Sequence, residues 1–154
     1  MITNNYYELA KKKLFKLNRS ITGKDTEKTL KIIKKNFTNL KIKNVKSGTK
    51  VYDWVIPPEW NIFDAYVKDK YGNKIINFKQ NNLHLVSYSK KVSKIIKRND
   101  LIKKLYTNTK LKDSIPYVTS YYKKDWGFCV SNNFLRKFKK MYKKDDKFKV
   151  KIDS

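Results

Sequence analysis

The spacing of the apolar residues changes near residue 40, and this change restricts the fold more than any other feature of the sequence. Before it, apolar side chains recur every three or four positions, which is the period of an α-helix. The two resulting stripes are formed by Tyr6, Ala10, Leu14 and Leu17, and by Thr26, Leu30, Ile33 and Phe37. After it, apolar and polar residues begin to alternate, as in "LKIKNV" (40–45), which is the period of a β-strand. We therefore predict an α+β chain, with amphipathic helices over 4–18 and up to about residue 36, followed by a β-rich part.

The β-rich part consists of short apolar segments separated by turn residues. Pro57-Pro58 must end a strand over 49–56, because proline cannot donate a hydrogen bond to a neighbouring strand. Gly72-Asn73 favours a hairpin turn within 62–78. We also expect strands at 82–89, 117–122, 126–130 and 147–152, a short helix from Asn99 or Asp100 through Tyr106, and a helix over 132–138 capped by Ser131. The predicted domains are 1–46, with the helices and a first strand, and 47–154, a compact β-rich domain with short helices.

The charge of the chain is strongly positive. Its 38 Lys and Arg against 13 Asp and Glu give a net charge of +25, which attracts any polyanion in a salt-dependent way. However, only Arg19, Arg98 and Arg136 carry the guanidinium group that specific phosphate and base contacts prefer, and the lysines are scattered over nearly every segment. This pattern favours a solvated lysine-rich surface over a dedicated nucleic-acid reader, and it leaves non-specific polyanion binding open.

Membrane and secretion signals are not found in the sequence. It has no run of 18 apolar residues and no basic-then-apolar profile at its start. Cys129 is the only cysteine, so an internal disulfide is excluded. We expect a cytoplasmic protein with no membrane partner.

Few residues could carry chemistry. His84 is the only histidine, whereas a zinc site takes three or four ligands. Cys129 stands among apolar residues in "WGFCV", which favours packing, although an enzyme that uses Cys129 with His84 stays an alternative. Asp53, Glu59 and Asp64 could form a carboxylate pair, but nothing in the sequence fixes their separation, so ion pairing or turn capping is favoured over acid–base catalysis.

Four separate stretches, in this order, resemble the N-terminal part of a bacterial family of aminopeptidase-like proteins. They are "RSITG" (19–23), "SGTKVYDWVIPPEWNIFDAYVKD" (47–69), "NNLHLVSYS" (81–89) and "IPYVTSYYKKDWGFCVS" (115–131). The family is similar to zinc exopeptidases that have an α/β peptidase core, interrupted near its start by a small β-rich insert of unassigned function. The second stretch contains a window, 51–67, that is free of Lys and Arg.

The resemblance implies that the N-terminal helices belong to an incomplete α/β peptidase core and that the β-rich domain is the insert, which would flank and shape the active-site cleft. The zinc ligands of such a protein are expected beyond the insert, outside this chain. We therefore expect an N-terminal fragment of a zinc metallopeptidase that is inactive alone, with no catalytic or metal-binding residue and no cofactor of its own. The resemblance implies zinc and a peptide substrate only for the complete enzyme.

The expected partner is the missing C-terminal peptidase portion, in cis or as a separate chain. The residues expected to face the cleft are Asp53, Trp54, Glu59, Trp60, Asp64, His84, Tyr121 and Trp126. The alternative is a free-standing binding module for a protein partner or an anionic polymer such as nucleic acid.

Overall fold

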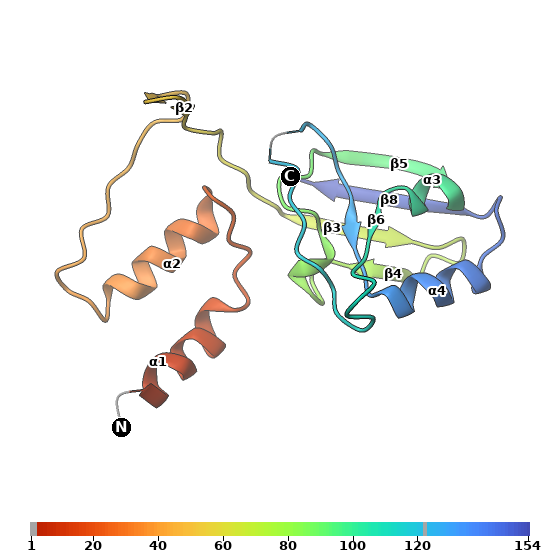
Figure 1. Cartoon of the computed structure of the whole chain (residues 1–154), viewed down its shortest axis with the longest axis horizontal. Coiled ribbons are helices and arrows are strands. Elements are labelled where there is room, and N and C mark those ends of the chain that lie inside the picture. The colour runs from red at the N-terminus through yellow and green to blue at the C-terminus, as the bar shows by residue number, and fades with distance from the viewer. Residues whose placement is uncertain (1–2, 122) are drawn as a thin grey trace. The chain divides into compact units, whose positions relative to one another are not determined.

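The chain forms two compact units. The structure is a computed structural model that describes residues 3–121 and 123–154. Unit 1 extends to Asn61, and unit 2 runs from Ile62 to Ser154 (Figure 1). No helix in the described part of the chain is long and apolar enough to cross a membrane.

The division between the units lies later in the chain than the expected domain boundary at 46/47. Hydrogen bonds join the segment before Ile62 to unit 1: Thr22 Oγ1 donates to the Pro58 carbonyl at 3.3 Å. The Lys24 amide donates to Asn61 Oδ1 at 2.8 Å. The assignment of the two domains themselves stays a prediction.

Unit 1 begins with two helical segments. Helix α1 (Thr3–Leu9) continues into a π-helical turn, η1 (Ala10–Leu14), and helix α2 (Lys24–Lys34) follows. Gly23 precedes α2 with a φ of 124°, and a Cβ at this position would lie 2.5 Å from the Trp60 carbonyl oxygen. Glycine is required there, because a side chain would meet both backbone strain and a steric clash.

The apolar stripes of these helices are not buried within unit 1. Tyr6, Leu30 and Phe37 remain 44%, 36% and 50% exposed, although the rings of Tyr6 and Phe37 stack with centroids 5.7 Å apart. Among the described residues of unit 1, only Thr29 and Pro57 are buried. The place of these helices in a peptidase core therefore stays a prediction.

The strands predicted for unit 1 are wrong in detail. Residues 40–45 form no strand, because no described strand of unit 1 lies beside them to pair with. Instead of one strand, 49–56 contain a tight antiparallel hairpin of β1 (Lys50–Val51) and β2 (Trp54–Val55). Tyr52 turns the chain with a φ of 54° in the middle of a run of strand-forming residues, where the apolar pattern carries no signal of a turn.

Unit 2 is built on a four-stranded antiparallel sheet in the order β4-β3-β8-β5. The strands are β3 (Asp64–Lys68), β4 (Lys74–Asn77), β5 (Val92–Lys97) and β8 (Lys147–Asp153). The hairpin of β3 and β4 and the strand β8 confirm the alternating patterns found in the sequence. The pattern does not predict β5, because Lys94 pairs with a buried position of β8 and Ile95 with an exposed one.

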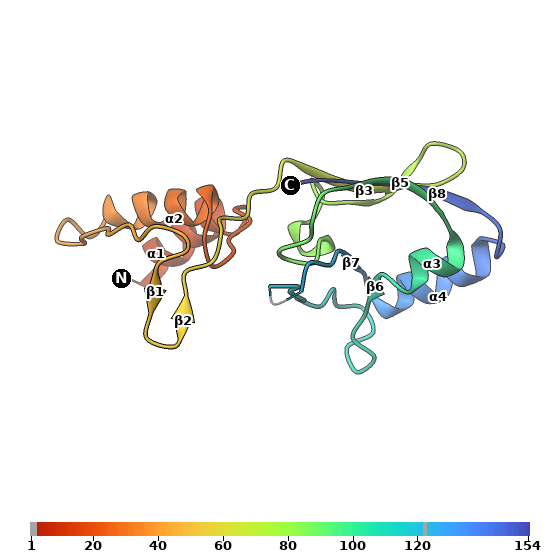
Figure 2. The ribbon, with the colours of Figure 1, turned by 90° about the horizontal axis from the view of Figure 1, so that it is seen from above.

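One face of this sheet, the inner face, is covered by the rest of unit 2. Phe148, Val150 and Ile152 of β8 are completely buried, and so are Ala65 and Val67 of β3. Figure 2 shows the elements that lie on this side of the sheet: α3 (Arg98–Ile102), α4 (Asn132–Met141), β6 (Leu105–Tyr106) and β7 (Phe128–Cys129). The apolar core lies between these elements and the sheet.

Helix α4 begins where the sequence predicts it. Ser131 is the N-cap, and its Oγ accepts a hydrogen bond from the Phe134 amide at 3.1 Å. Phe138 is buried, and its ring centroid lies 5.1 Å from that of Phe148 on the sheet. This aromatic contact joins the helix to the inner face.

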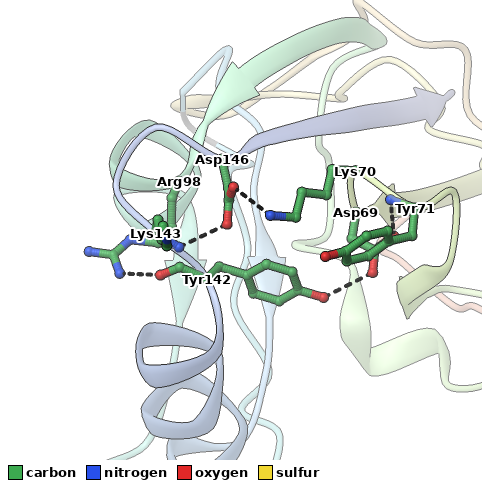
Figure 3. A network of polar contacts seen from close by, with 7 residues as sticks. All are labelled: Asp69, Lys70, Tyr71, Arg98, Tyr142, Lys143 and Asp146. Carbon is green, nitrogen blue, oxygen red and sulfur yellow. Dashed lines mark hydrogen bonds and ion pairs between the residues drawn. The ribbon is translucent and has the colours of Figure 1, made fainter.

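Asp69 joins the β3–β4 turn to the end of α4 (Figure 3). Its Oδ1 accepts hydrogen bonds from the amides of Tyr71 and Asn73, both at 2.9 Å, and its Oδ2 accepts one from the Tyr142 hydroxyl at 3.0 Å. Burial alone would raise the pKa of Asp69, but the hydrogen bonds from Asn73 and Tyr142 outweigh it and hold the pKa below its ordinary value. Burial, with the nearby Asp69 carboxylate, raises the pKa of Tyr142 to about 12.

Two further contacts hold the loop before β8. Arg98 Nη1 donates to the Tyr142 carbonyl at 2.7 Å (Figure 3). It also donates to the Lys139 carbonyl at 3.0 Å, and so satisfies backbone groups at the end of α4. Lys70 Nζ lies 3.0 Å from Asp146 Oδ1, and this hydrogen bond holds the pKa of Asp146 below its ordinary value. The polar network is therefore a structural link between the hairpin and the last strand.

Four other predictions for unit 2 differ from the structure in whole or in part. Residues 82–89 begin with a 3-10 turn, η2 (Asn82–His84), because the Asn81 side chain accepts a hydrogen bond from the Leu83 amide at 3.0 Å. Residues 117–121 contain an isolated bridge, at Thr119, in place of a strand, and residue 122 lies outside the described residues. The helix expected through Tyr106 ends at Ile102, and the strand expected over 126–130 is reduced to β7, which pairs with β6.

Candidate functional site

The eight residues expected to face a cleft are divided between the two units. Unit 1 contains Asp53, Trp54, Glu59 and Trp60, and unit 2 contains Asp64, His84, Tyr121 and Trp126. Their shared role at one cleft stays a prediction.

In unit 1, the four residues are mostly at the surface. Asp53 lies in the β1–β2 turn and is exposed, Trp54 is 42% exposed, and Trp60 is half-buried. Glu59 is exposed and lines a hollow of about 420 Å³ that also involves Leu30 of α2. A carboxylate pair formed by Asp53 and Glu59 stays a hypothesis.

In unit 2, Trp126 lies in the wall of a half-open pocket of about 270 Å³. The pocket is lined by Val86, Tyr106, Val118, Thr119, Ser120, Lys123, Asp125 and Trp126. These residues come from the third and fourth of the stretches that carry the family resemblance, with the exception of Tyr106. Segments that are far apart in the sequence thus meet at one surface hollow lined by both apolar and polar residues.

Two lysines flank the indole of Trp126. Lys94 Nζ lies 4.8 Å from its ring centroid and Lys104 Nζ lies 5.5 Å from it. Lys104 also pairs with Asp125 at 2.7 Å, and this hydrogen bond holds the pKa of Asp125 below its ordinary value. The sequence does not reveal these lysines, because 94 and 104 lie in segments that the resemblance does not include.

Tyr121 lies beside this pocket. Its amide donates to Thr119 Oγ1 at 3.2 Å, and its ring contacts that of Tyr88 edge to face, with centroids 5.1 Å apart. Tyr88 has a φ of 63°, an uncommon conformation for a tyrosine. Tyr121 and Trp126 are therefore the two predicted site residues that the structure brings to one region.

His84 and Cys129 are in contact, but not as a catalytic pair. His84 Nδ1 lies 2.8 Å from the Cys129 carbonyl oxygen, which can only accept, so the Nδ1 proton is donated to the backbone and not to the thiol. Cys129 is completely buried, and burial raises the pKa of its thiol to about 12. Burial disfavours the thiolate, and the His84 proton is directed to the backbone, so the geometry does not support an enzyme of the Cys–His type.

The described residues also do not fit a zinc ion. They contain no group of three or more His, Cys, Asp or Glu side chains that could ligate one metal. Asp64, at the start of β3, stands opposite Asp153 of β8, and its Oδ1 is buried with no hydrogen-bond partner. Two carboxylates without a third ligand do not make a metal centre.

These features define a class of protein: a small α+β chain whose β-rich unit has a surface pocket and whose described residues hold no group of three or more potential metal ligands. The chain belongs to the family described as "Domain of unknown function (DUF2172)", whose profile matches residues 59–154. The match begins close to the division between the two units.

A curated protein and a crystal structure, both from Clostridium acetobutylicum, extend the similarity to the N-terminal helices. One carries the provisional name "polysaccharide biosynthesis protein with aminopeptidase-like domain" and is 50% identical over 141 residues, which are 92% of this chain and 31% of the relative. The other is the crystal structure of a provisionally named peptidase, 46% identical, with a TM-score of 0.89, covering 99% of this chain and 34% of that one. The chain thus spans about a third of the length of each of these relatives.

Proposed function

We propose that this chain is the non-catalytic N-terminal portion of an aminopeptidase-like zinc protein, in which unit 1 docks on the peptidase core and unit 2 shapes access to the active site. The chain binds no zinc and hydrolyses no peptide alone. Zinc, when bound in the complete assembly, would polarise the scissile carbonyl and activate a water molecule. The similarity to larger proteins named for peptidase or aminopeptidase-like domains supports this proposal over a free-standing module.

The observation that carries the proposal is the exposed apolar surface of unit 1. Phe15 of the segment after η1 is 57% exposed, and Leu30 of α2 is 36% exposed. In contrast, all large apolar side chains that are buried in the described chain belong to unit 2. A pair of short helices without a buried core is not stable alone, and it gains stability by packing on another surface.

The role of unit 2 rests on its pocket. Trp126 and the hydroxyl-bearing Thr119 and Ser120 line a hollow that is open to solvent, and Lys104 and Asp125 are fixed as an ion pair beside it. An apolar wall with a few polar groups suits contact with a peptide side chain. At the rim of an active-site cleft, such a pocket would select substrates whose side chains fit it, and the peptidase core would catalyse the reaction.

The docking is tested by reconstitution. The chain is mixed with the part of the clostridial relative that lies outside the matched third, and association is measured by calorimetry and gel filtration. We expect a stoichiometric complex that binds zinc and hydrolyses aminoacyl anilides, whereas this chain alone does neither. Zinc binding or hydrolysis by the chain alone would refute its non-catalytic role, and no complex would refute the docking.

A matched pair of variants locates the docking surface. Phe15→Ser with Leu30→Ser should weaken association about 30-fold, because burying the exposed halves of two such side chains contributes about 2 kcal/mol. Leu111→Ser with Tyr117→Ser is the control, because these residues of unit 2 are 62% and 66% exposed. Equal weakening by both pairs would contradict docking through unit 1.

A further inference from the structure

The outer face of the unit 2 sheet is the face opposite α3 and α4. In Figure 2 the elements of unit 2 other than the sheet lie below it, and neither of the labelled helices of unit 2 lies on the upper side of β3, β5 and β8. Residues paired directly across antiparallel strands share a face, so the register identifies the side chains of this outer face. They include Tyr66 and Lys68 of β3, with Lys149 and Lys151 of β8.

Lysines that look scattered in the sequence meet on this face. The β3–β4 register shifts between Val67 and Lys68, and beyond this shift Lys68 pairs with Lys74 of β4, whose ammonium group lies over the ring of Tyr66 on the outer face. On its other side Lys68 pairs with Lys149 of β8, so three lysines form a row across three neighbouring strands. Lys147 likewise stands opposite Lys97 of β5. The strands of a sheet are about 4.8 Å apart, so this row is a continuous band of positive charge.

Such a band works against the stability of the sheet. Like charges directly opposite each other on neighbouring strands are destabilising. Of the six lysines on this face, Lys97 is paired with a carboxylate, Asp145, at 3.0 Å. For the other five, the described residues provide no ion pair within 4.0 Å. An external polyanion would neutralise this row.

An aromatic ring stands within this band. Tyr66 is half-buried, and the ammonium groups of Lys74 and Lys68 lie 4.5 and 5.6 Å from its ring centroid. Asn77 and Lys151 stand on either side of it in the next row. An aromatic ring among cations on an open antiparallel sheet is the arrangement on which proteins stack unpaired bases while they bind the backbone phosphates.

We propose that the outer face of the unit 2 sheet binds single-stranded nucleic acid, with Lys68, Lys149 and Lys151 at the phosphates and Tyr66 against a base. The binding is largely independent of sequence, because no arginine stands on this face to read base edges. An anionic polysaccharide could use the same lysines, so the stacking on Tyr66 is what distinguishes the two polymers. The surface lies wholly within unit 2 and does not depend on the proposed peptidase role.

The test is fluorescence anisotropy of a labelled twelve-residue oligothymidylate with the full chain, over a range of salt concentrations. The wild type should bind with a Kd between about 1 and 100 µM at physiological salt. The triple variant carries Lys68→Gln, Lys149→Gln and Lys151→Gln, and it should bind at least about 10-fold more weakly than the wild type. Each lost phosphate contact lowers the slope of log Kd against log salt by about 0.7, so the three substitutions together should lower this slope by about 2. Its melting temperature should rise, because the variant removes like-charge pairs.

The matched control is Lys112→Gln, Lys137→Gln, Lys140→Gln, which removes the same number of charges at exposed positions outside this face. Equal losses in the two triple variants would overturn the proposal, because binding would then follow net charge alone. Tyr66→Leu should weaken binding of the oligonucleotide about 10-fold and leave binding of a heparin dodecasaccharide unchanged. An unchanged affinity for the oligonucleotide, or an equal loss for both polymers, would refute nucleic acid as the ligand.

Discussion

The hydrogen bond between Tyr142 and Asp69 is expected to stabilise unit 2 by a measurable amount. Tyr142→Phe removes only the hydroxyl that donates to Asp69 Oδ2 at 3.0 Å and keeps the ring that packs against Phe148, 5.0 Å away between centroids. Both partners are buried, each 8% exposed. A hydrogen bond to a charged group is worth about 1.5–3 kcal/mol, and Asp69 keeps its bonds to two backbone amides, so we expect a loss of about 2 kcal/mol.

The assay is urea unfolding at pH 7, with thermal melting beside it. For a unit of this size, a loss of about 2 kcal/mol corresponds to a melting temperature about 10 °C lower. Tyr117→Phe is the control, because Tyr117 is 66% exposed, and it should change the free energy of unfolding by less than about 0.5 kcal/mol. Equal effects in Tyr142→Phe and Tyr117→Phe would refute the reasoning.

The pH dependence of stability is a second test of the hydrogen bond between Tyr142 and Asp69. The pKa of Asp69 is lower in the folded chain than its unfolded value of about 3.9, so its contribution to stability is present above that value and lost as the pH falls through the folded pKa. Because Tyr142→Phe removes one cause of the lowered pKa, the variant should lose less stability between pH 5 and pH 2 than the wild type does. Parallel acid unfolding curves for the two proteins would show that the hydroxyl does not act on Asp69.

Three further predictions concern unit 2. Gly127→Ala should cost about 1–3 kcal/mol in urea unfolding, because a Cβ there would lie 2.6 Å from the Tyr106 ring; an unchanged stability would show that the ring moves freely. Cys129 should resist thiol reagents at pH 8 until the protein unfolds, since it is buried and its pKa is raised to about 12; rapid labelling of the folded protein would contradict this burial. Lys70→Gln should raise the pKa of Asp146 towards its ordinary value in an NMR titration, and a pKa that does not move would show that the ion pair has no influence on this carboxyl group.

The elements that the sequence predicts best are those with one buried face and one solvent-exposed face. β8 is such an element, because Phe148, Val150 and Ile152 alternate with lysines and are all buried. Helix α4 is predicted for a different reason, since Ser131 supplies a local capping signal that needs no knowledge of the tertiary structure. Both signals are contained in a few consecutive residues.

The elements that the sequence does not predict depend on distant partners. β5 places Lys94 towards Trp126 and Ile95 in solvent, so its pattern makes sense only when its position at the edge of the sheet is known. The residues around the pocket follow the same rule. The sequence identifies Trp126 as a candidate, but it does not identify Lys104 as its neighbour. The two residues are about twenty positions apart, and no local sequence pattern predicts a contact between them.

The row of lysines is hidden for a related reason. Lys74, Lys68 and Lys149 are separated in the sequence and become neighbours only through the register of three strands. A count of charges therefore describes the attraction of the whole chain to polyanions, whereas the register is needed to find a surface on it.

The central position of β8 has a consequence for the synthesis of the protein. β8 pairs with both β3 and β5, but the ribosome makes it roughly eighty residues after β3, which takes on the order of ten seconds at a typical rate of translation. During this time β3 and β5 each lack a neighbour, and unpaired strand edges are prone to pair with other chains. The nascent chain is therefore expected to need protection by chaperones until β8 leaves the ribosome.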